Sequence, residues 1–312
     1  MKEREESPRI FGAPAGDQVK EGTEFQSYLQ IPDWKDSKEE DMSTTSSVTR
    51  RNFLKASAAG VFAFQFVPRH VVGGDASTPP SRKINLAAIG AGGQAGGDLG
   101  NMADENIVAI CDVDDRRAAG SYKRWPDAKR FKDFRKMFDE MGDKIDAVLV
   151  GTPDHTHAVA AMAAMKRGKH VFCEKPLAHS VAEVRAMSRE AAERKLITQT
   201  GNQGHSSESI RNFVEWVQAG AIGEVKEVHA CCGAFKDVYN RVRNLEKVLN
   251  ERPAVPKEVD WDLWQGPAAE RPYHDDYLPW NWRGWTRYGS GTIGDWVCHV
   301  VDPSFWALDL DM

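Results

Sequence analysis

The fold is decided by Lys83-Ile84-Asn85-Leu86-Ala87-Ala88-Ile89-Gly90-Ala91-Gly92-Gly93-Gln94-Ala95. The first half is a short apolar run, which predicts a buried strand of a parallel sheet. The second half has the form G-x-G-x-x-A. In this form Gly90 allows a tight turn, Gly92 lets the backbone approach a pyrophosphate, and Ala95 lets the next helix pack closely on the strand. The pattern predicts a loop, including Gly93 and Gln94, that binds a dinucleotide at the N-terminus of a helix.

A second apolar run, over residues 107–111, ends at Asp112, about 20 residues after the loop. An acidic side chain at this place binds the ribose hydroxyls of the nucleotide. A carboxylate there also repels a 2′-phosphate, so Asp112 favours NAD, whereas Arg116 and Arg117 just behind it leave NADP open. The alternative is a glycine-rich turn with an unrelated acid at a strand end. The order strand, loop, helix, strand and acid argues against that alternative.

Strand-like and helix-like segments continue to alternate up to about residue 200. The apolar runs predict strands over 145–150, 170–173 and 196–200, and the apolar spacing predicts helices over 155–167 and 181–195. Such alternation is typical of the α/β class, with a doubly wound parallel sheet. We therefore place a Rossmann-like NAD(P)-binding domain over residues 83–200.

The composition of the 312 residues excludes several classes of protein. Apolar residues are 41% and charged residues 28%, which permits a sizeable core. A net charge of −5 without a long basic run argues against a nucleic-acid partner. No apolar run reaches the roughly 18 residues that a membrane-spanning helix needs. The five cysteines include no C-x-x-C pair, so neither a zinc ribbon nor a disulfide framework is expected.

The segment before the first strand reads as export signal rather than as fold. Residues 1–41 are polar and aperiodic, and we expect them to be disordered. Arg50 and Arg51, in T-R-R-N-F-L-K before an apolar run, resemble a Tat-type signal, with a surface arginine pair before a short core helix as the alternative. We expect translation to start at Met42, residues 1–41 to be a start-site artefact, and residues 42–82 to be signal and linker. The protein would then be periplasmic, or cytoplasmic if the signal is not used.

Two further motifs follow predicted strands: Thr152-Pro153-Asp154-His155-Thr156-His157 and Cys173-Glu174-Lys175-Pro176-Leu177. Together with the glycine loop and Asp112 they resemble the glucose–fructose oxidoreductase/inositol dehydrogenase/rhizopine-catabolism (Gfo/Idh/MocA) family, from about Lys83 to the end of the chain. The resemblance implies an NAD(P)-dependent oxidoreductase acting on CH–OH groups of a carbohydrate-like substrate. It also implies a second, α+β domain whose open antiparallel sheet serves substrate binding and subunit pairing, so a homo-oligomer is expected for a full-length member.

The resemblance assigns roles to the residues of these motifs. The lysine of E-K-P lies beside the nicotinamide in that family and contacts the reacting hydroxyl group, and Lys175 matches it. An ammonium there polarises the substrate oxygen and stabilises a developing alkoxide, whereas the alternative is a solvated lysine in a turn. The family often has a cis peptide bond before the proline. By the same resemblance, five further residues are expected to lie along the cofactor: Thr152, Pro153, His155, His157 and Glu174. The H-x-H spacing has no suitable third ligand, so no metal is expected.

A second family motif, an aspartate and a histidine four residues apart on a helix, matches Asp295 and His299. Such residues share one helix face, and Asp302 would continue it. Oxidation of an alcohol requires removal of the hydroxyl proton, which suits a histidine, so His299 is the predicted general base and Asp295 contacts or orients the substrate. The alternative is a capping aspartate and a surface histidine. By position alone, we expect substrate contacts from Asn202, Gln203, His205 and Asp302.

The second domain, residues 201–312, is expected to be partial. Residues 224–235 alternate like the first strand of the antiparallel sheet, and an aromatic segment follows up to residue 291. Its rings, with Arg283 and Arg287, suit a sugar site, and packing of the rings over the sheet is an equal alternative. The family normally has several more strands after the D-x-x-x-H helix, so we expect a truncated or shortened domain.

The leading hypothesis is hydride transfer between NAD(P) and a hydroxyl carbon of a sugar, polyol or related compound. One alternative is an NAD-dependent glycoside hydrolase that acts through transient oxidation, as relatives of the family do. The other is a non-catalytic nucleotide-binding protein or an inactive fragment. Lys175, Asp295 and His299 argue against that last alternative.

Overall fold

The computed structural model describes residues 82–232 and 245–310, which all belong to one compact unit, residues 66–312. The segment predicted to be disordered, 1–41, and nearly all of the predicted signal and linker, 42–82, lie outside the described residues. Within the described ranges, no helix has the length and apolar character needed to cross a membrane.

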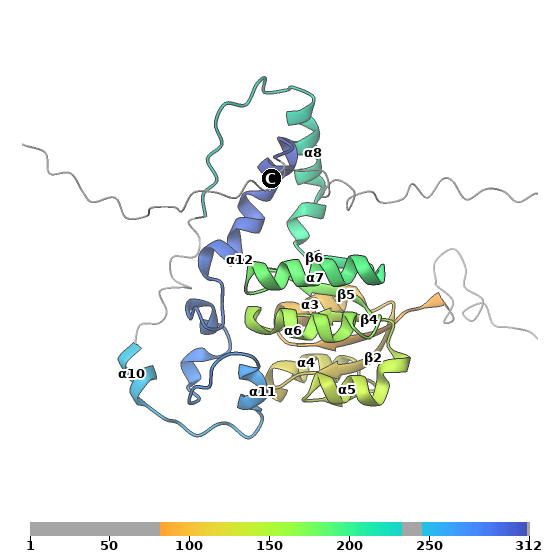
Figure 1. The fold of residues 1–312 in the computed structure, drawn as a ribbon, viewed down its shortest axis with the longest axis vertical. Coiled ribbons are helices and arrows are strands. Elements are labelled where there is room, and N and C mark those ends of the chain that lie inside the picture. Colours follow the sequence, from red (N-terminus) through yellow and green to blue (C-terminus); the bar gives the residue numbers. More distant parts are fainter. Residues whose placement is uncertain (1–81, 233–244, 311–312) are drawn as a thin grey trace, which may run out of the picture. The chain divides into compact units, whose positions relative to one another are not determined.

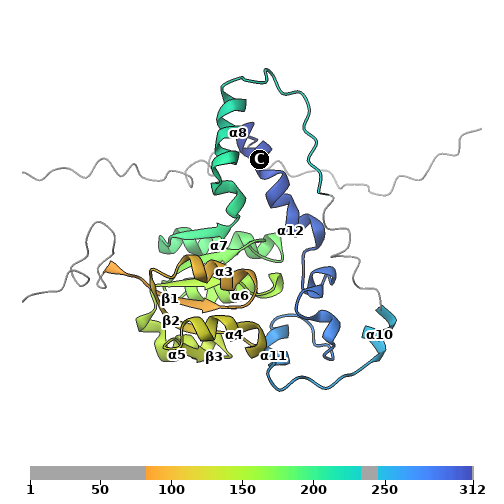
Figure 2. The same ribbon diagram turned by 180° about the vertical axis from the view of Figure 1, so that it is seen from behind.

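Six parallel strands form a sheet in the order β3-β2-β1-β4-β5-β6 (Figures 1 and 2). The strands are β1 (Asn85–Ile89), β2 (Asn106–Cys111), β3 (Lys129–Phe131), β4 (Ala147–Val150), β5 (His170–Glu174) and β6 (Thr198–Gly201). β1 pairs with β2 on one side and with β4 on the other, so the strand order reverses between β1 and β4. Ligands of such sheets bind at the carboxyl ends of the strands at this reversal. The predicted doubly wound sheet is confirmed.

Helices cover both faces of the sheet. One face carries α3 (Gln94–Asn101) and α4 (Asp115–Arg124), and the other carries α5 (Phe134–Met141), α6 (Asp154–Met165) and α7 (Val181–Arg194), with η3 (Gly142–Lys144) leading into β4. Side chains alternate along a strand. Leu86 and Ala88 of β1 therefore pack under the first pair of helices, and Ala87 and Ile89 under the second group. Because both sides are buried, the strand reads as a continuous apolar run.

After β6 the described residues form helices and irregular segments. The helices are η4 (Gln203–Ser206), α8 (Glu208–Gln218), α10 (Leu245–Asn250), α11 (Trp261–Gln265), η5 (Asp275–Tyr277), η6 (Asn281–Gly284), α12 (Gly291–Val300) and α13 (Asp302–Ala307). The strand predicted over residues 224–235 is wrong for residues 224–232, which form no strand. A strand needs a neighbour for its N–H and C=O groups, and no described segment pairs with these residues. The expected antiparallel sheet is therefore absent from the described residues.

Most rings of the aromatic segment form an apolar core of their own. Trp261 stacks on Trp264 with ring centroids 4.7 Å apart. The same cluster holds Val248, Tyr273, Tyr277, Trp282 and Tyr288. The alternatives for this segment were a sugar site and packing of the rings over a sheet. These rings do pack, but against one another and not over a second sheet. Trp280 differs, because it is 42% exposed and lies against Arg283.

Direct contacts join this aromatic core to the nucleotide-binding part. The Asp260 N–H donates to the Val113 carbonyl at 2.8 Å, just after β2. Ser290 donates from its N–H and its hydroxyl to the buried Asp154 carboxylate, at 3.0 and 2.5 Å. These contacts place residues 260–290 beside the carboxyl ends of β2 and β4, where the sheet reverses.

Candidate active site

The glycine loop has the shape that close approach of a ligand requires. Gly90 has φ +77°, and a Cβ there would lie 2.9 Å from the Gly151 backbone. A Cβ on Gly92 would lie 2.8 Å from the Arg117 carbonyl oxygen. Two hydrogen bonds hold the loop. The Gly90 N–H donates to the Cys111 carbonyl at 2.8 Å, and the Ser121 hydroxyl donates to the Ala91 carbonyl at 2.6 Å. A side chain at either glycine would displace the backbone from this position.

α3 begins directly after the loop and has an uncapped, uncharged N-terminus. No side chain caps it, and no acidic residue lies in its first turn. Its first N–H groups therefore remain available to an anion, which the helix dipole also favours. Ala95 is buried, and a Cβ added to Gly151 would lie only 2.3 Å from the Cβ of Ala95. The helix and the sheet therefore pack as closely as the motif predicts. These groups fit the pyrophosphate of a dinucleotide.

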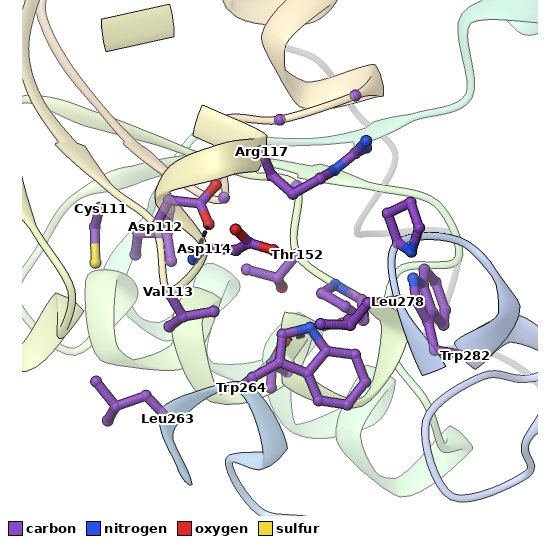
Figure 3. A pocket seen from close by; sticks show the side chains of 18 of the residues that line it. Cys111, Asp112, Val113, Asp114, Arg117, Thr152, Leu263, Trp264, Leu278 and Trp282 are labelled. Atoms are coloured by element: carbon purple, nitrogen blue, oxygen red, sulfur yellow. Dashed lines mark hydrogen bonds between the residues drawn. The ribbon is translucent and has the colours of Figure 1, made fainter. Parts of the chain in front are cut away.

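A cavity of about 170 Å³ lies between the glycine loop and the aromatic segment (Figure 3). Thr152 lines it with a buried hydroxyl that has no hydrogen-bond partner among the described residues, as expected where a ligand supplies one. The predicted cofactor residues on its wall are Gly90, Gly92, Gly93, Gln94, Asp112, Thr152 and Pro153. Asp114 and Lys132 on the wall were not expected there from the sequence. The wall also includes part of the aromatic segment, for which a sugar site was one of the two alternatives: Trp264, Trp280, Trp282 and Arg283.

Asp112 ties the glycine loop to the end of β2. Its Oδ2 accepts a hydrogen bond from Ala91 N–H and its Oδ1 from Asp114 N–H, both at 2.9 Å. Burial raises the pKa of Asp112. Arg116 does not line the cavity and pairs with Asp114 at 2.8 Å. Burial alone would raise the pKa of Asp114, but the hydrogen bond and charge of Arg116, together with the backbone N–H groups of Arg116 and Arg117, lower it. Arg117 lines the cavity instead, near the loop.

His155 and His157 lie in packing contacts rather than on the cavity wall. His157 is 1% exposed, and its Nδ1 and Nε2 each lie 2.7 Å from a carbonyl oxygen, of Pro176 and Thr152. Because carbonyls only accept, these two contacts favour a proton on each nitrogen; although burial opposes the charge, Cys173 and these contacts raise the pKa of His157 to about 9. Burial lowers the pKa of His155 to about 4, and its Nε2 lies 3.0 Å from the Trp264 carbonyl. Their predicted cofactor contacts remain predictions.

Lys175 and Asp295 form an ion pair between the two halves of the chain. The Lys175 Nζ donates to Asp295 Oδ1 at 2.5 Å and reaches the Asp295 carbonyl at 3.3 Å. The two side chains are only 13% and 8% exposed. The peptide bond from Lys175 to Pro176 is cis, as the resemblance implied. The structure thus brings together the E-K-P turn after β5 and the D-x-x-x-H helix, α12.

Arg283 joins this pair to the cavity. Its Nε lies 3.3 Å from Asp295 Oδ2, and its guanidinium lies 3.9 Å from the Trp280 ring centroid and 4.2 Å from that of Trp282. Asp295 therefore has a cation on each oxygen. The sequence offered no signal for this contact beyond the place of Arg283 among the aromatic residues.

His299 lies half-buried on α12, one turn after Asp295, and its ring centroid is 5.1 Å from that of Trp296. Burial, and then the positive charge of Lys175, lower the pKa of His299. A neutral imidazole at neutral pH is able to take a proton, as a general base must. No group of three or more His, Cys, Asp or Glu side chains in residues 82–232 and 245–310 is placed to hold a metal ion.

The predicted substrate residues lie along α12 and α13. Asn202 donates to the Cys298 carbonyl at 3.0 Å, and Gln203 is exposed on η4. His205 pairs with Asp302 at 3.0 Å and stacks on Trp306. The prediction that Asp302 continues the helix of Asp295 is wrong. α12 ends at Val300 and Asp302 begins α13, because Pro303 has no N–H group for the continuing helix but is tolerated in the first turn of a new one.

The fold and this site define an NAD-binding protein of the oxidoreductase class. The model of the oxidoreductase family's NAD-binding Rossmann fold matches residues 84–202, and that of its C-terminal alpha/beta domain matches residues 208–312. The chain therefore belongs to the Gfo/Idh/MocA oxidoreductase family, and the predicted resemblance and the predicted cofactor, NAD, are confirmed.

Individual relatives match over part of their length. Inositol 2-dehydrogenase 1 of Saccharopolyspora erythraea is 34% identical over 170 residues, 53% of this chain and 48% of that protein. Levoglucosan dehydrogenase of Pseudarthrobacter phenanthrenivorans is 25% identical over 62% of this chain and 40% of its own. Among solved structures, an inositol dehydrogenase homologue of Azotobacter vinelandii with NADH and myo-inositol is 25% identical, covering 47% and 42% of the chains with a TM-score of 0.42. The chain thus spans less than half the length of these relatives.

Proposed function

We propose that the chain is the nucleotide-binding and catalytic part of an NAD-dependent dehydrogenase that oxidises a hydroxyl carbon of a cyclic polyol or sugar. The observation that carries the proposal is the Lys175–Asp295 pair at the carboxyl end of β5, with His299 one turn away. The names of the relatives, inositol 2-dehydrogenase and levoglucosan dehydrogenase, support the substrate class.

Each residue of this group has a distinct task. Bound NAD supplies the acceptor for the hydride. The Lys175 ammonium stabilises negative charge on the substrate oxygen, and the Asp295 carboxylate holds that ammonium in place. His299 takes the hydroxyl proton, for which its lowered pKa keeps it neutral at pH 7. Trp280 and the Arg283 side chain offer the partly exposed ring and donors that a sugar-like substrate binds.

The test is NADH formation from NAD with myo-inositol, levoglucosan and related compounds. We expect Lys175→Ala and His299→Ala to lower kcat by about 10²- to 10⁴-fold, because each loses a group that acts in the transition state. The matched controls, Lys123→Ala and His229→Ala, change exposed side chains and keep the wild-type rate. Unchanged turnover in Lys175→Ala would refute the assignment, and product without free NADH would favour glycoside cleavage.

We also propose that Asp112 makes the protein prefer NAD over NADP. Asp112→Asn loses the negative charge that binds the ribose hydroxyls and repels a 2′-phosphate. The expected result is a KM for NAD raised about tenfold, the equivalent of losing about 1.4 kcal/mol of hydrogen bonding to a charged group, with a smaller change for NADP. Steady-state kinetics with both cofactors measures the ratio, and Asp127→Asn, an exposed acid, is the control. An unchanged ratio would contradict the proposal.

For localisation, we propose export by the Tat route. The support is the T-R-R-N-F-L-K motif before the apolar run that starts at Ala56. Residues 42–82 fused to a reporter should appear in the periplasm of a Tat-competent bacterium. Conversion of Arg50 and Arg51 to lysine should retain the reporter in the cytoplasm, since the charge is kept and only the motif is lost. Equal export of both fusions would reject the proposal.

A further inference from the structure

A buried pair of carboxyl groups, Asp98 and Glu174, lies next to the site and has no task in the mechanism above. Glu174 is 7% exposed and is the last residue of β5, directly before Lys175. Asp98 lies on α3, the helix that begins at the glycine loop. The Asp98 carboxyl group lies within hydrogen-bonding reach of the Glu174 side chain and acts on its pKa. Asp98 Oδ2 is buried and receives no hydrogen bond from a donor group of the described residues.

The other contacts of the pair lead in two directions. Glu174 Oε2 accepts a hydrogen bond from Lys175 N–H at 3.2 Å, and Asp98 Oδ1 accepts one from the Gln94 amide at 2.9 Å. On β6, a Cβ added to Gly201 would lie 2.2 Å from Glu174 Oε1, so glycine makes the space that the carboxyl group fills. A continuous set of contacts therefore runs from the start of α3, through both carboxyl groups, to the backbone of Lys175.

Two carboxylates cannot hydrogen-bond to each other without a proton, because each offers only acceptors. We propose that Asp98 and Glu174 share one proton, and that this hydrogen bond positions Lys175 relative to the glycine loop. Both are positioning residues, since they act through the backbone that binds NAD. The proposal rests on the NAD site and not on the identity of the substrate.

The shared proton makes the arrangement sensitive to pH near neutrality. Burial, and then the charge of Asp98, raise the pKa of Glu174 to about 7, while Lys175 opposes this. The charged groups that face Glu174 are Asp98 from α3 and Lys175 on its own turn, and β6 contributes the uncharged Gly201. Once the proton leaves, two adjacent negative charges repel each other beneath a site that binds a pyrophosphate. NADH affinity should therefore fall as the pH rises through 7.

The experiment measures NADH dissociation constants by fluorescence on both sides of pH 7, without substrate. For the wild-type protein we expect the Kd to rise about tenfold through the transition, the equivalent of a pKa shift of one unit on binding. Glu174→Gln replaces the shared proton by an amide N–H that does not dissociate, so its Kd should stay flat. Asp98→Asn removes the charge that raises the pKa of Glu174, so its transition should move to lower pH. Asp104→Asn, an exposed acid just after α3, makes the same change of charge and should keep the wild-type profile.

Infrared spectroscopy of the protein without NADH gives an independent readout. The carbonyl stretch of a protonated carboxyl group should be present below pH 7 and lost above it in the wild type, and absent from Glu174→Gln. A wild-type pH profile or a retained band in Glu174→Gln would overturn the proposal. If Glu174→Gln does not fold, Asp98→Asn decides the question, because an unchanged transition in that variant would overturn the proposal too. Because NADH binding needs no turnover, the pH effect without any dehydrogenase activity would refute only the proposed function.

Discussion

At the residue scale, Asp295 shows how a carboxylate is kept ionised in a nearly closed site. Burial of a lone carboxylate is costly, but Asp295 has Lys175 on one oxygen and Arg283 on the other. The guanidinium is in turn held over the rings of Trp280 and Trp282. Arg283 therefore divides the attraction of Asp295 between two cations and leaves the Lys175 ammonium less tightly bound to it.

We expect Arg283→Met to lower kcat/KM by about tenfold to a hundredfold, the range for loss of one hydrogen bond to a charged group. Asp295 would then hold Lys175 alone, and more firmly, away from the substrate oxygen. Arg283→Lys keeps the charge but loses the flat group that stacks on the two rings, so it should restore only part of the rate. Steady-state kinetics measures both, with the exposed Arg185→Met as control. Full activity in Arg283→Met would show that Arg283 does not act on the pair.

At the scale of elements, one histidine of α6 joins two turns. His157 contacts the Thr152 carbonyl in the turn after β4 and the Pro176 carbonyl in the turn after β5. The first turn lines the NAD cavity and the second carries Lys175. One buried imidazole thus joins the turns after β4 and β5.

His157→Gln should lower the free energy of unfolding by about 1–3 kcal/mol, because both N–H groups of a glutamine amide leave one nitrogen, whereas the two carbonyls face different ring nitrogens of the histidine. The folded-state pKa of His157 is raised, so its contribution is fully present below pH 6.5 and is lost as the pH rises through about 9. The difference between wild type and variant in urea unfolding should therefore shrink over that range. The exposed His229→Gln is the control. A difference that stays constant up to pH 9 and beyond would show that His157 is neutral.

At the scale of the molecule, the aromatic core docks on the nucleotide-binding part through α6. The His155 ring lies between Trp264 and Tyr288, with centroids 5.2 and 5.0 Å away, and Ser290 binds the neighbouring Asp154. The cavity for NAD exists only while this contact holds, because residues of both parts line it.

This contact should weaken in acid. The pKa of His155 is lowered to about 4 in the folded protein, so between pH 6.5 and 4 the unfolded chain binds the extra proton. Stability should therefore decrease as the pH falls through this range, by up to about 3 kcal/mol. His155→Phe keeps a ring between Trp264 and Tyr288 and removes the proton site, so its unfolding free energy should depend less on pH. The exposed His229→Phe is the control, and an equal acid dependence in wild type and His155→Phe would contradict this account.

Local patterns predicted much of this architecture and failed where a neighbour was needed. The sheet, the glycine loop and α12 follow from short-range spacing, because strand burial and helix faces repeat along the chain. The alternation over residues 224–235 has the same period but no described partner strand, and periodicity does not supply one. Asp302 lies outside the helix of Asp295 for a local reason, because Pro303 lacks the N–H group that a continued helix needs and so sits in the first turn of a new one.

The sequence by itself determined the doubly wound nucleotide fold, although it did not indicate the short strand β3, and it determined the preference of the loop at Gly90 for a dinucleotide and the family. These depend on residue types that a local backbone requires, such as glycine at φ +77°. Only the tertiary structure decided that Arg283 and Lys175 both bind Asp295, that His157 contacts the carbonyls of two turns, and that Asp98 lies beside Glu174. These contacts join residues far apart in the chain, and their charge states depend on burial and on the groups opposite, which no spacing in the sequence encodes.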